Sequence, residues 1–199
     1  PLLIGTAGTC GSDTAVDWML DITLEIARER GEHLKIATMK SGQDRSQVKA
    51  ALDKGRITAL DGAPAIDGPI VEDCTNIVAL AGIEQIQAAL ETEADIIIAG
   101  RATDTAVIAA LPVARGCHRG AAWHGAKVAE CGALATTNPN SGVILMTFDE
   151  TGFVIEPMAD AAAATPNTVS AHMLYENADP FILHEPGGYL DVSESRYIA

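Results

Sequence analysis

Asp95-Ile96-Ile97-Ile98-Ala99-Gly100-Arg101 is the stretch that most strongly predicts a fold in this sequence, since three β-branched residues stand together between an acid and a glycine. Such an unbroken apolar run is typical of a parallel strand that is covered on both faces, because a half-exposed strand would alternate apolar with polar residues. Two short apolar runs earlier in the chain, 2–4 and 33–39, are each followed by a helical pattern. The repeated strand–helix order predicts an α/β fold with a mostly parallel, doubly wound sheet.

The second half of the chain predicts a different kind of structure, an α+β extension with a β-hairpin. We expect residues 1–115 to form the α/β layer and residues 116–199 to pack on it, so that the two form one structural unit. The remaining expected helices span 13–30, 44–54, 83–90, 103–110, 121–135 and 166–175, and the remaining expected strands span 76–81, 143–148 and 153–156. Pro112 is expected to close the helix over 103–110, and residues 58–69 to form turns. The tail from Pro180 to Gly188 is expected to be irregular and to return to strand near Tyr189.

Composition excludes several classes of partner. The chain has 27 acidic and 13 basic residues, a formal charge of −14 and only 4% aromatic residues. Such a surface repels phosphodiester backbones and anionic membranes, so we expect no nucleic acid and no membrane partner. The four cysteines show neither C-x-x-C pairs nor zinc-ribbon spacing, which favours free thiols, no metal site and a cytoplasmic location.

The first candidate ligand loop is Gly5–Ser12, which follows the first strand. It lacks the spacing of a dinucleotide-binding fingerprint and the lysine of a P-loop. Glycines at positions such as Gly8, beside Thr9, allow a ligand to approach the backbone closely, and the next helix offers free N–H groups to an anion. The alternative is a glycine turn that only connects strand and helix.

The second candidate loop, Gly100–Thr105, follows the Ile96–Ile98 run at the edge of the sheet where ligands usually bind. The guanidinium of Arg101 suits a carboxylate or phosphate, and the alternative is a structural ion pair. Thr103 lies beside it. Asp104 is a candidate to orient Arg101, to act as an acid or base, or simply to cap the following helix.

Two clusters of titratable residues lie further along the chain. On the helix expected over 121–135, His124, Lys127 and Cys131 share one face while Glu130 is turned away, and the alternative is an ordinary half-buried face. Near the next helix, His172 and Glu176 stand four positions apart, followed by His184-Glu185-Pro186; a surface helix end is the favoured interpretation there. Cys117-His118-Arg119 is interpreted as surface.

Four segments together resemble the acyclic terpene utilisation (AtuA-like) family: 1–9, 94–106, 122–133 and 172–180. The resemblance implies a cytoplasmic catabolic protein in pathways that process branched or terpenoid acids through CoA thioesters. It also implies that this chain is a central fragment of a longer protein. It raises Arg101, Asp104, His124, Glu130 and Glu176 as candidate site residues without giving any of them a role.

These observations predict an enzyme, a lyase, hydratase or isomerase, that acts on a small carboxylic acid or acyl-CoA thioester by proton transfer. Gly8, Thr9, Arg101, Thr103 and Glu176 are the predicted binding residues. His124, Asp104 and Glu130 are the predicted proton-transfer residues. The sequence leaves the cofactor unknown, and the open alternatives are no cofactor or coenzyme A as part of the substrate. The alternative is a non-catalytic subunit or binding module completed by a partner chain, and either a homo-oligomer or a partner subunit is expected.

Overall fold

The computed structural model describes residues 1–140, 142–175 and 177–199, and the chain divides into two compact units. The sheet unit contains Leu2–Leu80 and Asp95–Ala102, and the hairpin unit contains Ala81–Ala94 and Thr103–Ala199 together with Pro1. The chain therefore passes from one unit to the other several times. The boundary near residue 115 that the sequence indicates stays a prediction, because contacts between residues do not show which segments fold on their own.

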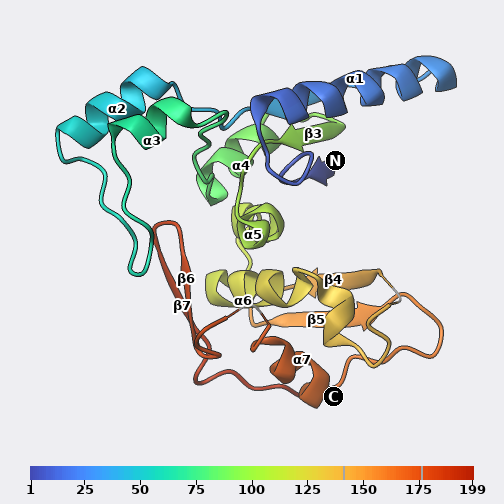
Figure 1. Cartoon of the computed structure of the whole chain (residues 1–199). Helices are drawn as coiled ribbons and strands as arrows, with labels where there is room; N and C mark the ends of the chain where they lie inside the picture. The colour runs from blue at the N-terminus through green and yellow to red at the C-terminus, as the bar shows by residue number, and fades with distance from the viewer. Residues whose placement is uncertain (141, 176) are drawn as a thin grey trace. The chain divides into compact units, whose positions relative to one another are not determined.

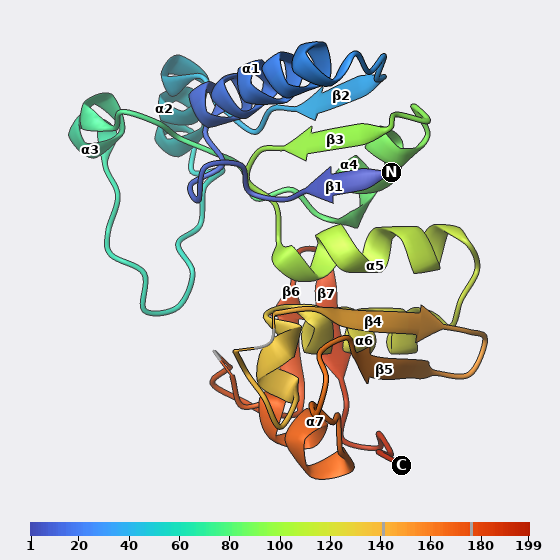
Figure 2. The ribbon, with the colours of Figure 1, turned by 90° about the vertical axis from the view of Figure 1, so that its right-hand side faces the viewer.

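The sheet unit is built on three parallel strands, β1 (Leu2–Ile4), β2 (Ile36–Met39) and β3 (Ile96–Ala99), in the order β1-β3-β2. The Ile96–Ile98 run forms the central strand, with Ile97 opposite Leu3 on one side and Ala37 on the other (Figure 2). Ile97 and Ile98 are fully buried, as the unbroken apolar run predicts. The predicted α/β class is confirmed: helices and a parallel sheet in the first half are followed by small antiparallel hairpins.

Three helices belong to the sheet unit: α1 (Asp13–Arg30), α2 (Arg45–Asp53) and α3 (Gly68–Asp73). The hydroxyl of Ser12 accepts a hydrogen bond from the Ala15 amide at the start of α1, and Gly31 ends this helix in the left-handed conformation. Val16 of α1 packs against Ile98 and Ala7 in a small apolar core, so α1 lies on the sheet (Figure 2).

One expectation for the sheet unit is wrong. Residues 76–81 form no strand; Val78 makes an isolated antiparallel bridge to Gly42. The amide of Ala79 donates to the Ser41 carbonyl and that of Gln43 to the Ile77 carbonyl, so this apolar segment pairs with the loop after β2 rather than with the sheet. Leu80 is 49% exposed, and the run therefore lacks the burial that a central strand needs.

The hairpin unit contains four α-helices, one short 3₁₀ helix and two β-hairpins among the described residues (Figure 1). The helices are α4 (Ile83–Leu90), α5 (Asp104–Ala114), α6 (Arg119–Ala129), η1 (Gly132–Ala135) and α7 (Pro166–His172). The hairpins pair β4 (Ile144–Phe148) with β5 (Phe153–Pro157) and β6 (Ile182–Glu185) with β7 (Gly188–Asp191). None of the described helices is long and apolar enough to cross a bilayer.

Small residues allow the elements of the hairpin unit to pack closely. The buried faces of α5 and α6 are largely alanine, including Ala106 and Ala109 on α5 and Ala126 on α6. At Gly125 a Cβ atom would lie 2.5 Å from a ring carbon of Phe148, so the β4–β5 hairpin sits directly against α6. Val128, Val169, Met173 and other apolar residues form the core beneath α6.

Three further expectations needed correction in this unit. The helix expected to close at Pro112 continues to Ala114, because a proline in the last turn removes one amide while those of Arg115 and Gly116 still bond within the helix. The helix expected over 121–135 ends at Ala129, where Glu130 forms the C-cap and Cys131 turns into the left-handed region at φ 50°. Residues Ile182–Glu185, expected to be irregular, form β6 and pair with β7, the strand expected near Tyr189, since Gly187 at φ 85° permits the tight turn.

Candidate functional site

The glycine loop after β1 packs directly against the loop after β3. The Arg101 amide donates to the Gly11 carbonyl (3.1 Å), and the Thr6 hydroxyl donates to the Ala102 carbonyl (3.2 Å). At Gly11, which has φ 65°, a Cβ atom would lie 2.3 Å from the Arg101 nitrogen. Gly8 also has positive φ, and its Cβ would lie 2.7 Å from that of Ala15. The loop therefore requires glycine at both positions for backbone geometry.

Arg101 is partly buried in this loop, and its guanidinium has no ion pair among the described residues. Its positive charge helps to lower the pKa of the Cys10 thiol, after the hydrogen bonds that this thiol shares with Ser12. Thr9 is exposed with φ 67°. Gly8, Thr9 and Arg101 thus lie at one edge of the sheet unit, and their role in binding an anion stays a prediction.

The start of α1 already holds a carboxylate. Asp13 stands in the first turn and accepts the amide of Gly42 (2.8 Å). A cavity of about 310 Å³ opens beside it, lined by Asp13, Gly42–Arg45 and Thr75–Val78. An external anion at this helix end would meet the negative charge of Asp13, so the loop amides and Arg101 would have to supply the attraction.

Thr103 and Asp104 begin α5, in the hairpin unit. The Thr103 hydroxyl accepts the amide of Ala106 (3.0 Å), so Thr103 and not Asp104 is the N-cap. Asp104 is the exposed first residue of the helix, where a carboxylate stabilises the positive end of the helix dipole.

His124 is buried in α6 and both of its ring nitrogens have partners. Its Nε2 lies 3.1 Å from the Tyr197 hydroxyl and its Nδ1 lies 3.3 Å from the Ser195 hydroxyl, while Phe153 packs edge-on against the ring. Burial lowers the pKa of His124 to about 4, so the ring is neutral at neutral pH. The contacts of this imidazole with Ser195 and Tyr197 fix the C-terminal segment on α6. A role of His124 in proton transfer stays a prediction.

Lys127 and Glu130 form a largely buried ion pair at the end of α6. Lys127 Nζ lies 2.8 Å from Glu130 Oε2, and each side chain is 13% exposed. The Thr105 hydroxyl donates to the same carboxylate oxygen (3.1 Å), and His172 Nε2 lies 2.9 Å from the Glu130 carbonyl oxygen. The expectation that Glu130 turns away from this face was wrong: residues three positions apart lie next to each other on a helix, and Glu130 at the C-cap reaches Lys127.

Glu185, at the end of β6, joins this cluster. Its Oε2 is buried and has no hydrogen-bond partner in the described part of the chain. Burial raises the pKa of Glu185 above its ordinary value, while the Thr105 and Thr103 hydroxyls act in the opposite direction. The charge of Lys127 lowers this pKa and that of Glu130 raises it. Two carboxyl groups near one ammonium group thus have different environments: Glu130 is ion-paired with Lys127, whereas Glu185 keeps one buried oxygen without a partner among the described residues. Such a difference is a common arrangement for acid–base catalysis.

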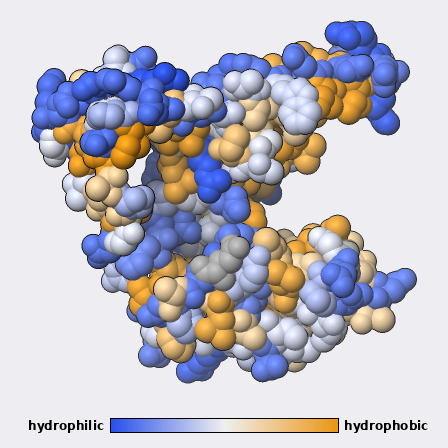
Figure 3. Space-filling view, in the orientation of Figure 1, coloured by the Kyte–Doolittle hydropathy of each residue, from blue (hydrophilic) through white to orange (hydrophobic). Residues whose placement is uncertain are grey.

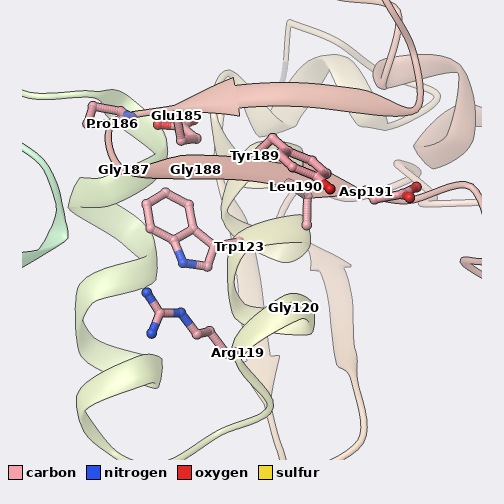
Figure 4. Close-up of a pocket in the computed structure, with 10 residues that line it drawn as sticks. All are labelled: Arg119, Gly120, Trp123, Glu185, Pro186, Gly187, Gly188, Tyr189, Leu190 and Asp191. Atoms are coloured by element: carbon pink, nitrogen blue, oxygen red, sulfur yellow. The ribbon is translucent and has the colours of Figure 1, made fainter.

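Glu185 also lines a cavity of about 400 Å³ within the hairpin unit. Arg119, Gly120 and Trp123 of α6 form one wall, and Glu185–Asp191 of the β6–β7 hairpin form the other (Figure 4). Figure 4 shows the guanidinium of Arg119 and the indole of Trp123 next to each other on one side of α6, with the indole between Arg119 and the hairpin. Arg119 is exposed, as expected for a surface residue, but it belongs to the wall of a cavity.

The structure thus divides the predicted site residues between the two units. Gly8, Thr9 and Arg101 lie in the sheet unit, whereas Thr103, Asp104, His124 and Glu130 lie in the hairpin unit; Glu176 lies outside the described residues. In the described part of the chain no three His, Cys, Asp or Glu side chains gather closely enough to hold a metal ion.

Sequence reasoning gave little weight to Glu185 and Arg119. Their grouping depends on the β6–β7 hairpin, which brings residue 185 to the ends of α5 and α6. The single available signal was the pair of glycines after Pro186, which marks a tight turn.

Fold and site together define an α/β protein with a buried acid–base cluster beside a small cavity. The model of the acyclic terpene utilisation family, AtuA, matches residues 7–198, and the chain belongs to this family. No curated protein and no solved structure matches the chain.

Proposed function

We propose that this chain is a catabolic enzyme that acts on a small carboxylic acid or acyl-CoA thioester by proton transfer, as a lyase, hydratase or isomerase. The observation that carries the proposal is Glu185, a buried carboxyl group with an unpartnered oxygen that lines a cavity. Its raised pKa lets it hold a proton at pH values where exposed glutamates have lost theirs.

The neighbouring residues support a proton-transfer role for Glu185. Lys127 pairs with Glu130, and the Thr105 hydroxyl fixes the orientation of the Glu130 carboxylate. The ammonium group of Lys127 stabilises negative charge that develops nearby when a carbon-bound proton is removed. In this proposal Glu185 takes and returns the proton, and Glu130 and Lys127 set the charge around it.

Hydrogen–deuterium exchange tests this proposal without knowledge of the full reaction. Enzymes that remove and return a proton next to a carbonyl exchange that proton with solvent, so incubation in deuterated water with a panel of carboxylic acids and acyl-CoA thioesters should label one of them. We expect Glu185→Gln to reduce the labelling rate by about 100-fold or more. Glu150→Gln, an exposed residue between β4 and β5, is the matched control and should label at the wild-type rate.

Two outcomes contradict the proposal. One is wild-type protein that labels no member of the panel while binding at least one of them, as judged by a thermal shift. The other is a Glu185→Gln variant that labels as fast as the wild type.

Exposed apolar surface on α1 favours a second candidate, a non-catalytic module that a partner chain completes. Trp18, Leu24 and Ile26 are 60%, 44% and 49% exposed, and apolar patches reach the surface over this helix (Figure 3). Such side chains are often covered in assemblies. Light scattering together with the exchange assay separates the two candidates: a monomer that labels substrate excludes the module, and a stable oligomer that labels nothing supports it.

A further inference from the structure

The cavity between α6 and the β6–β7 hairpin has two different polar ends and an apolar middle. Arg119 supplies a guanidinium that has no ion pair among the described residues, in a chain where acids outnumber bases two to one. Asp191 also lines the cavity, but its Oδ1 accepts hydrogen bonds from the amide (2.9 Å) and hydroxyl (2.6 Å) of Ser193, and Figure 4 shows its side chain apart from that of Arg119. An anionic ligand is the partner that Arg119 lacks.

Glu185 marks the other polar end. Its buried Oε2 has no partner in the described chain, and a buried polar atom left unpaired destabilises the folded state. A ligand hydroxyl or carbonyl oxygen would pair with this carboxyl group, whether as donor or as acceptor. Between the two ends, Trp123 and Leu190 offer apolar surface.

We propose that this cavity binds a small free carboxylate that also carries a hydroxyl or oxo group, with the carboxylate on Arg119, the carbon chain along Trp123 and Leu190, and the second oxygen on Glu185. The inference rests on the proposed function in its use of Glu185 and narrows the substrate class to free hydroxy- or oxo-acids. A cavity of about 400 Å³ is large enough for such an acid.

The fluorescence of Trp123 gives a direct binding assay. The chain has two tryptophans, and Trp18 is 60% exposed on α1, so a Trp18→Phe background leaves Trp123 as the reporter. The probes are butyrate, hexanoate, their β-hydroxy derivatives and the corresponding amides. We expect the acids to change the fluorescence and the amides to bind at least tenfold more weakly, because an amide cannot form a charge-assisted bond to Arg119.

Two variants assign the two ends of the ligand. Arg119→Gln should weaken binding of every acid about 10- to 100-fold, whereas Arg115→Gln, which removes an exposed charge from the end of α5 outside the cavity, should leave binding unchanged. Glu185→Leu should abolish the preference for β-hydroxy acids while binding of the unsubstituted acids persists.

The inference is overturned if amides bind as tightly as acids, or if Arg119→Gln binds every acid as the wild type does. Its failure is distinguishable from failure of the proposed function. Binding through Arg119 without proton exchange would overturn the function alone, and exchange into thioesters that Arg119→Gln does not affect would overturn the inference alone.

Discussion

The two units of this chain differ in what shifts the pKa values of their titratable groups. In the sheet unit, the titratable groups with shifted pKa values are exposed, and hydrogen bonds cause the largest part of each shift, as for Cys10 and Asp44. In the hairpin unit, burial is the first cause for His124, His172 and Glu185. Exposed capping aspartates such as Asp149 occur in the hairpin unit as well, so the difference lies in the buried groups.

This difference separates residues that shape a loop from residues that can do chemistry. A hydrogen-bonded carboxylate at a turn is stabilised in its charged form and holds its proton poorly at neutral pH. Burial instead disfavours the charged form of a carboxyl group and raises its pKa, which makes it a better proton acceptor and donor near neutral pH than an exposed carboxylate. The hairpin unit is therefore the better candidate for catalysis, although the loops of the sheet unit occupy the position where α/β proteins usually bind ligands.

The largest expected effect on stability comes from replacing one ion-paired lysine in each unit and comparing the two losses of unfolding free energy. Lys127→Met leaves Glu130 charged without its partner in a setting where each side chain is only 13% exposed, and we expect a loss of about 3 kcal/mol in unfolding free energy. Lys40→Met breaks the pair with Asp17, where the side chains are 45% and 54% exposed, and should change stability little.

Each unit carries its own tryptophan, which makes the measurement specific. Trp18 lies in the sheet unit and Trp123 in the hairpin unit, so urea unfolding of Trp→Phe variants follows the two units separately. Equal shifts of the urea midpoint for Lys127→Met and Lys40→Met would show that the contrast between buried and exposed pairs is wrong.

The pH dependence of stability should differ between the two units because of His124. Its pKa falls from 6.5 to about 4 on folding, so the folded state disfavours the charged ring. The resulting stability is fully present above pH 6.5 and is lost as the pH falls through about 4, by up to about 3 kcal/mol. A His124→Gln variant should lack this loss between pH 6.5 and 4.

His33→Gln is the matched control, because His33 is exposed in the sheet unit. We expect this variant to keep the wild-type dependence on pH, measured by urea midpoints at closely spaced pH values. A His124→Gln variant with the same loss of stability on acidification as the wild type would refute the assignment to the buried imidazole.

The parts of the fold that local sequence determines were predicted well. The Ile96–Ile98 strand, the helix over Ile83–Leu90 and the hairpin from Ile144 to Pro157 each have a clear apolar period or turn signal, and each formed as expected. The end of α6 was not predicted, because Cys131 adopts a left-handed conformation that usually requires glycine or asparagine. The run 76–81 was assigned to a strand because it is apolar. Its sequence does not show whether the segment pairs with the sheet or with a loop.

The candidate site was predictable only in part, for a related reason. Glu130 was identified as a candidate from the family resemblance, but its partners Thr105 and Lys127 depend on where the helix ends. Glu185 lies 55 positions from Glu130 in the sequence, and the desolvation that raises its pKa comes from long-range packing. Residue type and spacing do not reveal burial of this kind.

The smallest expected effect concerns the sheet unit and the thiol of Cys10. Cys10 and Cys131 are both exposed, but hydrogen bonds from Ser12 and the charge of Arg101 lower the pKa of Cys10 from 9.0. A larger thiolate fraction makes Cys10 alkylate a few-fold faster than Cys131 at neutral pH, and the advantage should shrink as the pH rises past 9.0. Mass spectrometry after timed treatment with iodoacetamide measures both rates in the same sample. Ser12→Ala and Arg101→Gln should each slow the alkylation of Cys10 and leave that of Cys131 unchanged. Equal alkylation rates for the two thiols at every pH would mean that the hydrogen bonds of this loop do not lower the pKa of Cys10.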